Sequence, residues 1–155
     1  EELGITVVSS RITACGDNTL NMILQVRLKT KIPFSDVASD SWYASSVMWA
    51  YENGIVNGYE DGSFRPGKEI TRQEIVTMLH RYVVSLGKDN GQRSDLAAFT
   101  DLDQLMGYAE DAMQWAVANG IINGISETQL GPQQSANRAQ TVTILYRIIT
   151  GILGE

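Results

Sequence analysis

Apolar side chains recur with helical spacing in the segment that spans residues 71–86. They fall at positions i, i+3, i+4, i+7 and i+11, and they are Ile75, Met78, Leu79, Tyr82 and Leu86. Such a stripe predicts an amphipathic helix whose apolar face is buried. The segment opens with Thr71 and, three residues later, Glu74. Because a Thr hydroxyl and a Glu carboxylate at this spacing each satisfy a free backbone N–H group, we expect the helix to begin sharply at Thr71.

A second segment, residues 137–152, has the same pattern. Its apolar stripe consists of Ile144, Leu145, Ile148 and Ile152. Asn137 and Gln140 occupy the positions of the Thr and the Glu, and both residue types can fill the same capping roles. The start signal is therefore kept in different residue types, which predicts a second helix of the same kind.

A shorter helix is expected before each of these segments, over residues 42–53 and 108–119. A glycine follows each one, and glycine suits the left-handed residue that ends a helix. Trp49 and Trp115 lie in the middle of these helices, and we expect both to be buried in the core. Residues 55–66 contain too many glycines and turn-forming residues to be helical, so they are expected to form a loop.

The chain aligns with itself when it is shifted by 66 positions. The aligned identical pairs include Trp49 and Trp115, Gly54 and Gly120, Asn57 and Asn123, Arg72 and Arg138, and Arg81 and Arg147. A fixed period indicates one supersecondary unit used at least twice, with each copy covering the apolar face of its neighbour. The fold class is therefore mainly α, with tandem helix-loop-helix repeats over residues 34–86 and 99–152 and an exposed linker over residues 87–98. Any binding surface then lies between the copies or recurs once in each copy.

Residues 1–33 match this pattern poorly, and two interpretations of them stay open. Apolar and polar side chains alternate over residues 24–32, which predicts a β-strand. Gly16-Asp17-Asn18 could turn that strand back on residues 5–8, forming a short β-hairpin at the end of an upstream domain. Alternatively, residues 20–23 resemble part of the first long helix, as expected of a degenerate first repeat. The alternation favours the strand.

Composition and charge narrow the classes of partner. The 155 residues contain 12 Lys and Arg against 18 Asp and Glu, which gives a net charge of −6. An acidic chain argues against nucleic acid as the main partner, although a local cluster of Arg or Lys can still bind an anion. No stretch approaches the roughly 20 apolar residues of a membrane span, so we expect no membrane insertion. The first residues also lack the pattern of a signal peptide, which suggests a start after processing or inside a longer polypeptide.

The sequence contains no recognisable catalytic or metal-binding motif. His80 is the single histidine and has no Cys nearby, which argues against a metal site. Cys15 has no His partner in its local sequence and cannot form an internal disulfide, so we interpret it as a small buried residue. Residues 60–62 lack the alternating oxygen ligands and the closing Glu of an EF-hand loop. We therefore expect a protein that is not an enzyme and that uses no cofactor and no metal.

The motifs of the first copy resemble those of S-layer homology repeats, the modules that hold bacterial surface proteins on the cell wall. The matching residues are Phe34-x-Asp36, Trp42-Tyr43, Gly54-Ile55, Gly58-Tyr59-x-Asp61-Gly62-x-Phe64-x-Pro66 and Ile70-Thr71-Arg72-x-Glu74. The second copy keeps Phe99-x-Asp101, Gly120-Ile121, Pro132 and Asn137-Arg138-Ala139-Gln140. It departs from the pattern at Tyr108, Glu127-Thr128 and Leu130.

This resemblance implies an architecture and a ligand. Members of the family usually carry three repeats, which pack around a pseudo-threefold axis into a helical prong. Grooves between their repeats bind secondary cell-wall polysaccharide, commonly with a pyruvate ketal on the terminal sugar. The resemblance thus implies a non-catalytic module that anchors a larger bacterial protein to an anionic polysaccharide, outside the cell at the cell surface or wall.

Six positions are the ligand-binding residues that the resemblance implies. They are Asp36, Trp42, Gly62 and Arg72 in the first copy, and Asp101 and Arg138 in the second. The chemistry suits the ligand, because a guanidinium at a helix N-terminus can bind a pyruvyl carboxylate and an indole can cover a sugar ring. In the alternative interpretation, the arginines are solvated residues of a first turn and the aspartates only cap the turn before the shorter helix.

A third copy is not recognisable in the sequence. It would come from residues 1–33 in degenerate form, from sequence upstream, or from another chain through self-association that completes a three-repeat prong. The weaker motifs of the second copy also support a second hypothesis for the function. In that hypothesis the chain is a structural or protein-association domain, derived from these repeats, that no longer binds glycan.

Overall fold

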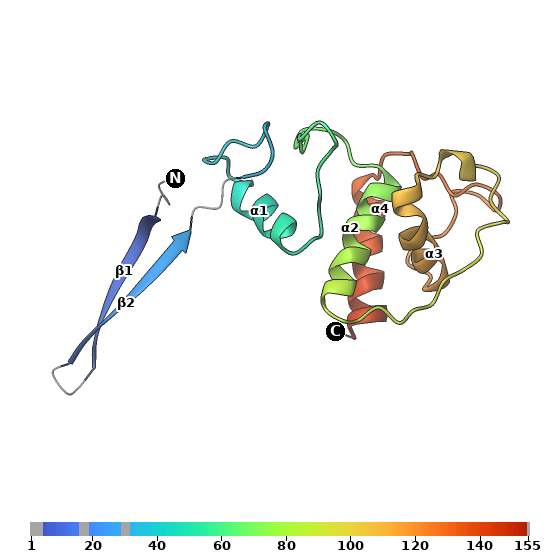
Figure 1. Ribbon diagram of the computed structural model, residues 1–155. Helices are drawn as coiled ribbons and strands as arrows, with labels where there is room; N and C mark the ends of the chain where they lie inside the picture. Colours follow the sequence, from blue (N-terminus) through green and yellow to red (C-terminus); the bar gives the residue numbers. More distant parts are fainter. Residues whose placement is uncertain (1–4, 16–18, 29–31, 155) are drawn as a thin grey trace. The chain divides into compact units, whose positions relative to one another are not determined.

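The computed structural model describes residues 5–15, 19–28 and 32–154 (Figure 1). The chain divides into two compact units, residues 1–33 and residues 34–155. The first unit contains a two-stranded sheet, and the second contains the helices and the loops that join them.

The sheet of the first unit is antiparallel. Its strands are β1 (Ile5–Cys15) and β2 (Thr19–Leu28), with a bulge between Val7 and Ser9. The hairpin interpretation of this segment is the one that the structure shows, since residues 20–23 lie within β2 rather than in a helix. The predicted turn at residues 16–18 lies outside the described residues, as do residues 29–31 of the predicted strand.

The second unit is built from helices in the order that the repeat predicts. The α-helices are α1 (Ala44–Glu52), α2 (Arg72–Ser85), α3 (Glu110–Ala118) and α4 (Arg138–Ile148). The shorter elements are the 3-10 turns η1 (Leu102–Gln104) and η2 (Gly107–Ala109) before α3, and the π-helical turn η3 (Ile149–Leu153) after α4. The prediction of a mainly α-helical chain with tandem helix-loop-helix repeats is confirmed.

Both long helices begin at the predicted capping boxes. At the start of α2, Thr71 Oγ1 accepts a hydrogen bond from Glu74 N (3.3 Å), and Glu74 Oε2 accepts one from Thr71 N (2.7 Å). At the start of α4, Asn137 Oδ1 accepts from Gln140 N (2.9 Å), and Gln140 Oε1 accepts from Asn137 N (3.0 Å). A cap of this kind stabilises a helix by about 1 kcal/mol, and here it also sets the register of each repeat.

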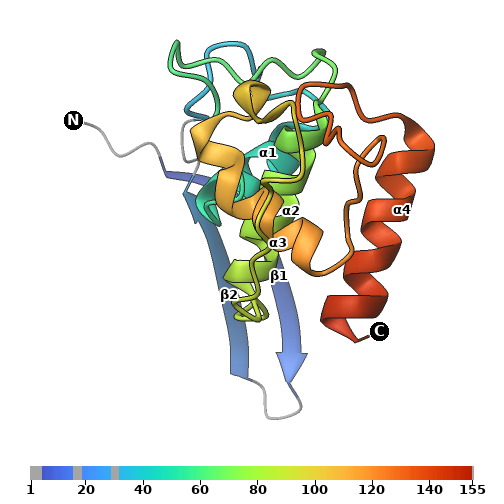
Figure 2. The ribbon, with the colours of Figure 1, turned by 90° about the vertical axis from the view of Figure 1, so that its right-hand side faces the viewer.

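Helix α2 belongs to the first repeat and also packs against the second. On one side, the ring of His80 on α2 lies 4.7 Å from the ring of Trp115 on α3; Figure 1 shows these helices side by side, and in Figure 2 α3 passes in front of α2. On the other side, Arg81 Nη1 on α2 donates to Ile55 O of the first repeat (3.4 Å). The main core cluster surrounds the contact between α2 and the second repeat and includes Val76, Val83, Met113, Trp115, Ile121, Leu130, Ile144 and Ile148.

The apolar stripe predicted for α2 is only partly buried. Ile75 is buried, but Met78, Leu79 and Tyr82 are half-buried and Leu86 is exposed. The prediction missed a second buried face, which consists of Gln73, Val76, Thr77, His80 and Val83. A helix held between two repeats buries two faces, whereas the periodicity of the largest apolar residues marks only one of them.

The two mid-helix tryptophans differ in burial. Trp115 on α3 is 0% exposed, as predicted, but Trp49 on α1 is 52% exposed, so the prediction is wrong for Trp49. The difference follows from the order of the repeats. Helix α3 is covered by α2 of the preceding repeat, whereas no helix precedes α1 in the part of the chain that the structure describes.

Candidate functional site

Asp36 and Asp101 hold the loop of their own repeat by the same contact. The two carboxylate oxygens of Asp36 accept hydrogen bonds from Phe64 N and Arg65 N, both at 2.7 Å. Those of Asp101 accept from the equivalent amides, Leu130 N (2.9 Å) and Gly131 N (2.8 Å). Each aspartate therefore closes a loop that lies 28 to 30 residues further along the chain, rather than capping the turn before the shorter helix.

The surroundings favour the ionised form of both aspartates. The hydrogen bond from Phe64 N, supported by that from Arg65 N, holds the pKa of Asp36 below its usual value. Burial opposes ionisation of Asp101, but the Leu130 and Gly131 amides outweigh it and likewise lower its pKa. Both side chains are therefore carboxylates at neutral pH, and their oxygens are engaged by the protein's own backbone.

Arg72 joins the two repeats. Its Nη2 atom donates to Asn123 O (2.8 Å) and its Nε atom to Leu130 O (3.3 Å), and both carbonyls belong to the loop of the second repeat. The residue is only 5% exposed, and burial lowers the pKa of the guanidinium against the opposing charge of Asp101. The structure thus gives Arg72 a positioning role between repeats, and its direct contact with a ligand stays a prediction.

The other three predicted site residues lie at exposed positions. Trp42 precedes α1 and is almost fully exposed, with its ring edge-to-face against Tyr43 at 5.4 Å between centroids. Gly62 occupies a turn of the first loop at a φ of +75°, where a side chain would be strained. Arg138 is exposed on the first turn of α4, and its guanidinium makes no hydrogen bond or ion pair within the described part of the chain.

The structure brings these six residues together only in pairs. Asp36 and Gly62 belong to the same closed loop, because Ser35 N, next to Asp36, donates to Gly62 O (3.0 Å). Arg72 and Asp101 both contact the backbone of Leu130. Arg72 Nε donates to the Leu130 carbonyl oxygen, and Asp101 Oδ1 accepts from the Leu130 N–H group. Trp42 and Arg138 take part in neither pair.

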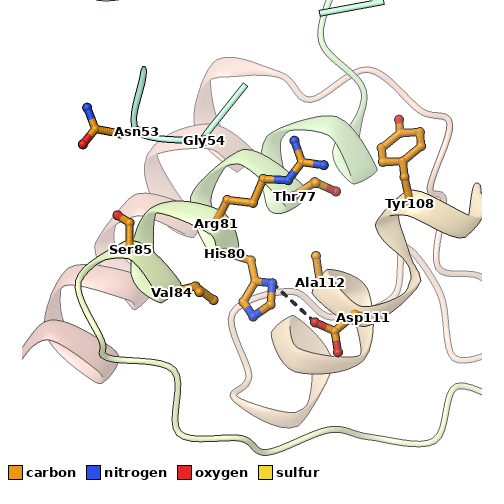
Figure 3. Close-up of a pocket in the computed structure, with 10 residues that line it drawn as sticks. All are labelled: Asn53, Gly54, Thr77, His80, Arg81, Val84, Ser85, Tyr108, Asp111 and Ala112. Atoms are coloured by element: carbon orange, nitrogen blue, oxygen red, sulfur yellow. Dashed lines mark ion pairs between the residues drawn. The ribbon is translucent and has the colours of Figure 1, made fainter. Parts of the chain in front are cut away.

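A groove runs along α2 between the two repeats. It consists of two adjoining cavities of about 500 and 400 Å³, which share Thr77, Arg81 and Tyr108. The larger cavity is also lined by the first loop, including Tyr59, Arg65, Pro66, Lys68 and Glu74. In the smaller cavity, shown in Figure 3, Arg81 lies between the end of α1 and Tyr108 of the second repeat.

The larger cavity contains an aromatic ring flanked by cations. The Tyr59 hydroxyl donates to Glu74 Oε1 (2.9 Å) and accepts from Lys68 Nζ (2.9 Å), which also lies 3.2 Å from Glu74 Oε1. The Arg65 guanidinium is 4.1 Å from the centroid of the Tyr59 ring, and Lys68 Nζ is 5.0 Å from it. The hydrogen bonds that Lys68 Nζ donates to Tyr59 and Glu74 raise the pKa of Lys68, so its ammonium group is charged at neutral pH.

The smaller cavity is bordered by a network of charges between α2, the linker and α3. His80 Nε2 lies 3.4 Å from Asp89 Oδ2, and His80 Nδ1 lies 3.8 Å from Asp111 Oδ2 (Figure 3 shows the second pair). Arg93 bridges the same two carboxylates, with Nη2 2.9 Å from Asp89 Oδ2. Its hydrogen bonds lower the pKa of both aspartates. The smaller cavity is therefore bordered by the ion pairs of Arg93 with Asp89 and Asp111, and the Arg81 guanidinium also lines it.

Sequence reasoning missed five groove residues, namely Tyr59, Arg65, Lys68, Arg81 and Tyr108. A signal existed for Arg81, because it recurs as Arg147 in the 66-residue alignment. That recurrence has a structural cause, since Arg147 Nη1 donates to Ile121 O (3.1 Å) as Arg81 does to Ile55 O. No signal pointed to Lys68, whose role arises only when the first loop folds against α2.

The described residues offer neither a metal site nor a membrane-spanning helix. Within these residues, no three His, Cys, Asp or Glu side chains come together as they would around a metal ion. None of the described helices is both long and apolar enough to cross a membrane.

Two tandem helix-loop-helix units with a groove between them define a repeat protein. The family model of the S-layer homology domain matches residues 33–76 and 98–142. Together these matches cover more than half of the chain, and they coincide with the two structural repeats. The chain belongs to the S-layer homology domain family.

Similar proteins include surface proteins and an enzyme. The chain is 33% identical over 119 residues to a cellulosome-anchoring protein of Acetivibrio thermocellus, covering 76% of this chain and 26% of that protein. It is 30% identical over 132 residues to the surface-layer 125 kDa protein of Lysinibacillus sphaericus, covering 83% of this chain and 11% of that protein. It is 32% identical over 117 residues to an amylopullulanase of Thermoanaerobacterium thermosulfurigenes, covering 75% of this chain and 6% of that protein. The chain thus spans about a quarter of the first of these relatives and about a tenth or less of the other two.

Proposed function

We propose that this chain is an extracellular, non-catalytic module that anchors its parent protein to the bacterial cell wall by binding an anionic secondary cell-wall polysaccharide. Membership of the S-layer homology family supports the anchoring role. The names of the relatives support it too, because they include anchoring and surface-layer proteins. The enzyme among them shares only 6% of its length with this chain, which fits an attached module rather than a catalytic domain.

The observation that carries this proposal is the groove along α2. It gathers Arg65, Lys68 and Arg81 in a chain whose net charge is −6. The Tyr59 and Tyr108 side chains add aromatic surface and hydroxyl groups in the same place. Cations recognise a carboxylate such as that of a pyruvate ketal, and aromatic rings pack against sugar rings, so an acidic glycan suits the groove on both counts.

In this proposal the predicted site residues act at two levels. Asp36 and Gly62 shape the first loop, while Arg72 and Asp101 fix the second loop and thereby the separation of the groove walls. Trp42 and Arg138 would contact glycan only in a groove that a further repeat completes, since neither residue lines the groove along α2. Self-association is one way to supply that repeat.

A pelleting assay with washed cell-wall sacculi tests the groove directly. Lys68→Met removes an accessible ammonium group, and Glu74 keeps its hydrogen bonds with Thr71 and Tyr59, so the helix cap should persist. We expect the apparent affinity for sacculi to fall about tenfold, which corresponds to about 1.4 kcal/mol. Lys88→Met, in the exposed linker, is the matched control and should pellet like the native chain.

The same assay separates the proposal from the second hypothesis, a protein-association domain without glycan binding. Exposed aromatic and apolar side chains on α1 and α4 favour that hypothesis. If it held, the native chain would stay in the supernatant at every sacculus concentration. Equal pelleting of the Lys68 and Lys88 variants would instead show that binding takes place outside the groove.

A further inference from the structure

The contact between the two repeats is formed by one face of α2 and one face of α3. Each of these helices has an equivalent in the other repeat, and no described residue covers the corresponding face of that equivalent helix. For α2 the equivalent is α4, 66 residues later. Val76 on α2 is 1% exposed, whereas the equivalent Val142 on α4 is 64% exposed. His80 is buried, whereas the equivalent Tyr146 is exposed. The face of α4 that contains Val142 and Tyr146 is thus an interface surface that nothing covers within the described residues.

The α3 face of the contact is repeated in the same way. Helix α3 receives α2, and its equivalent is α1. Trp115 and Ala112 on α3 are buried under α2, whereas the equivalent Trp49 and Ser46 on α1 are exposed. Helix α1 therefore exposes the equivalent of the α3 face, and α4 exposes the equivalent of the α2 face that packs against it.

Hydrogen bonds fix the internal contact and show what a second contact would need. They run from Arg72 N to Gln134 O (2.8 Å), from Gln73 N to Pro132 O (3.0 Å), and from the Arg72 guanidinium to Asn123 O and Leu130 O. The donors belong to the first turn of the long helix, and the acceptors belong to the loop of the following repeat. Other hydrogen bonds run the opposite way, from Ala136 N to Ile70 O (3.0 Å) and from Met106 N to Gln73 Oε1 (3.1 Å), so both repeats supply donors and acceptors to the contact.

The equivalent donors and acceptors are free at the two ends of the array. Across the described residues, the backbone N–H groups of Arg138 and Ala139 and the Arg138 guanidinium have no hydrogen-bond partner. At the other end, four carbonyl groups of the first loop accept no hydrogen bond from any described residue. They are those of Asn57, Phe64, Pro66 and Lys68, the equivalents of the four acceptors in the internal contact.

We propose that α4 of one copy of this chain docks on α1 and the first loop of a second copy, repeating the internal α2–α3 contact between chains. Arg138 takes the place of Arg72, and Tyr146 lies against Trp49 as His80 lies against Trp115. Val142, Tyr146 and Arg138 occupy the positions of Val76, His80 and Arg72 in the internal contact. Ala139 stands in place of Gln73 and cannot repeat its side-chain hydrogen bonds with Tyr108 and Met106 N. A second copy is the occupant because its first repeat carries the four carbonyls that are equivalent to the acceptors of Arg72 and of Gln73 N.

This docking is a specific form of the self-association named in the proposed function, and it rests on that proposal. The contact between the chains itself needs no bound glycan. The contact is heterologous, since a different surface of each copy is used, and it leaves one free face of each kind on a pair. The chain should therefore associate head to tail in glycan-free buffer. Trp42 and Arg138 then lie at the new contact, where a second groove would be lined by two chains.

Complementation between two face-blocking variants tests the proposal. Val142→Asp puts a charge on the α4 face, and Ser46→Arg puts bulk and charge on the α1 face; both positions are exposed, so the fold of each chain should persist. Sedimentation velocity of the native full chain should show association that rises with concentration. Each variant alone should associate at least tenfold more weakly, and an equimolar mixture of the two should form a one-to-one pair, because each keeps the face that the other lacks.

A control and a second readout make the result decisive. Lys88→Glu, in the linker, should associate like the native chain, and both face variants should still pellet with sacculi through the groove along α2. A native chain that stays monomeric throughout the concentration series would overturn the proposal, as would a mixture that fails to pair. Loss of pelleting in native chain that still associates would count against the proposed function alone.

Discussion

At the scale of single residues, the loops of both repeats depend on one carboxylate each. Asp101 is the more deeply buried of the two, and its oxygens accept hydrogen bonds from Leu130 N and Gly131 N. Those amides belong to the segment whose Leu130 carbonyl accepts from Arg72. Loss of the Asp101 charge should therefore loosen the second loop and the contact between repeats together.

This arrangement predicts a dependence of stability on pH. Because the folded-state pKa of Asp101 is lowered, its contribution to the free energy of unfolding is present above the unfolded-state pKa of about 4 and is lost as the pH falls through the lower folded-state value. Asp101→Asn should lower the free energy of unfolding at pH 7 by about 1–3 kcal/mol, since one loop amide loses its acceptor. Urea denaturation between pH 7 and pH 2 measures both effects.

The control for this prediction is Asp103→Asn, at an exposed position in η1. It should unfold like the native chain at pH 7. Equal stability of Asp101→Asn and the native chain at pH 7 would show that the loop does not need the carboxylate.

The sequence identified the two aspartates as site residues, but it did not show that their carboxylates accept hydrogen bonds from the loop amides. Asp36 and Asp101 recur with the same neighbours, and this recurrence marked them as important. Their acceptors lie 28 to 30 residues away, however, and that distance can be bridged only once the loop has folded. For Arg72 the sequence indicated an anion site at a helix N-terminus, whereas in the folded chain backbone carbonyls of the next repeat occupy two of its donors.

At the scale of elements, helix starts were predictable because they depend on local chemistry. The capping boxes at Thr71 and Asn137 form as the sequence indicated. Burial was less predictable, because it depends on which repeat stands next to a given helix. Trp49 and Trp115 occupy equivalent positions of the two repeats, yet only Trp115 has a preceding α2 to cover it.

The same asymmetry predicts unequal effects of one substitution at equivalent positions. Val76→Ala on α2 should lower the free energy of unfolding by about 2 kcal/mol, because it leaves a cavity in the core between the repeats. Val142→Ala on α4 should change it by less than about 0.5 kcal/mol, since that side chain is mostly exposed in a single chain. Thermal and urea unfolding at low protein concentration, where chains are separate, give the comparison.

Equal losses at the two valines would contradict this account of the helices. They would mean that α4 is covered as fully as α2 in the isolated chain. A smaller loss at Val76 than at Val142 would contradict it more strongly, because the contact between the repeats would then not depend on α2.

At the scale of the whole molecule, the 66-residue alignment predicted tandem repeats and a binding surface between them. The groove along α2 lies between the repeats, but its lining could not be read from motifs. Lys68, Arg81 and Tyr108 come from three elements whose separation depends on the closed loops. The sheet of the first unit was easier to predict than the groove, because the local alternation of apolar and polar side chains was enough to indicate a strand.

Calorimetric titration of the full chain with purified wall polysaccharide, before and after mild acid removes pyruvate, tests the central claim most directly. The groove gathers Arg65, Lys68 and Arg81 around aromatic surface, so we expect saturable binding to the native polysaccharide. Removal of the pyruvate carboxylate should weaken that binding at least about tenfold, which corresponds to about 1.4 kcal/mol. Absence of binding to either preparation would contradict the account, because a correctly folded groove would then have no anionic glycan to hold.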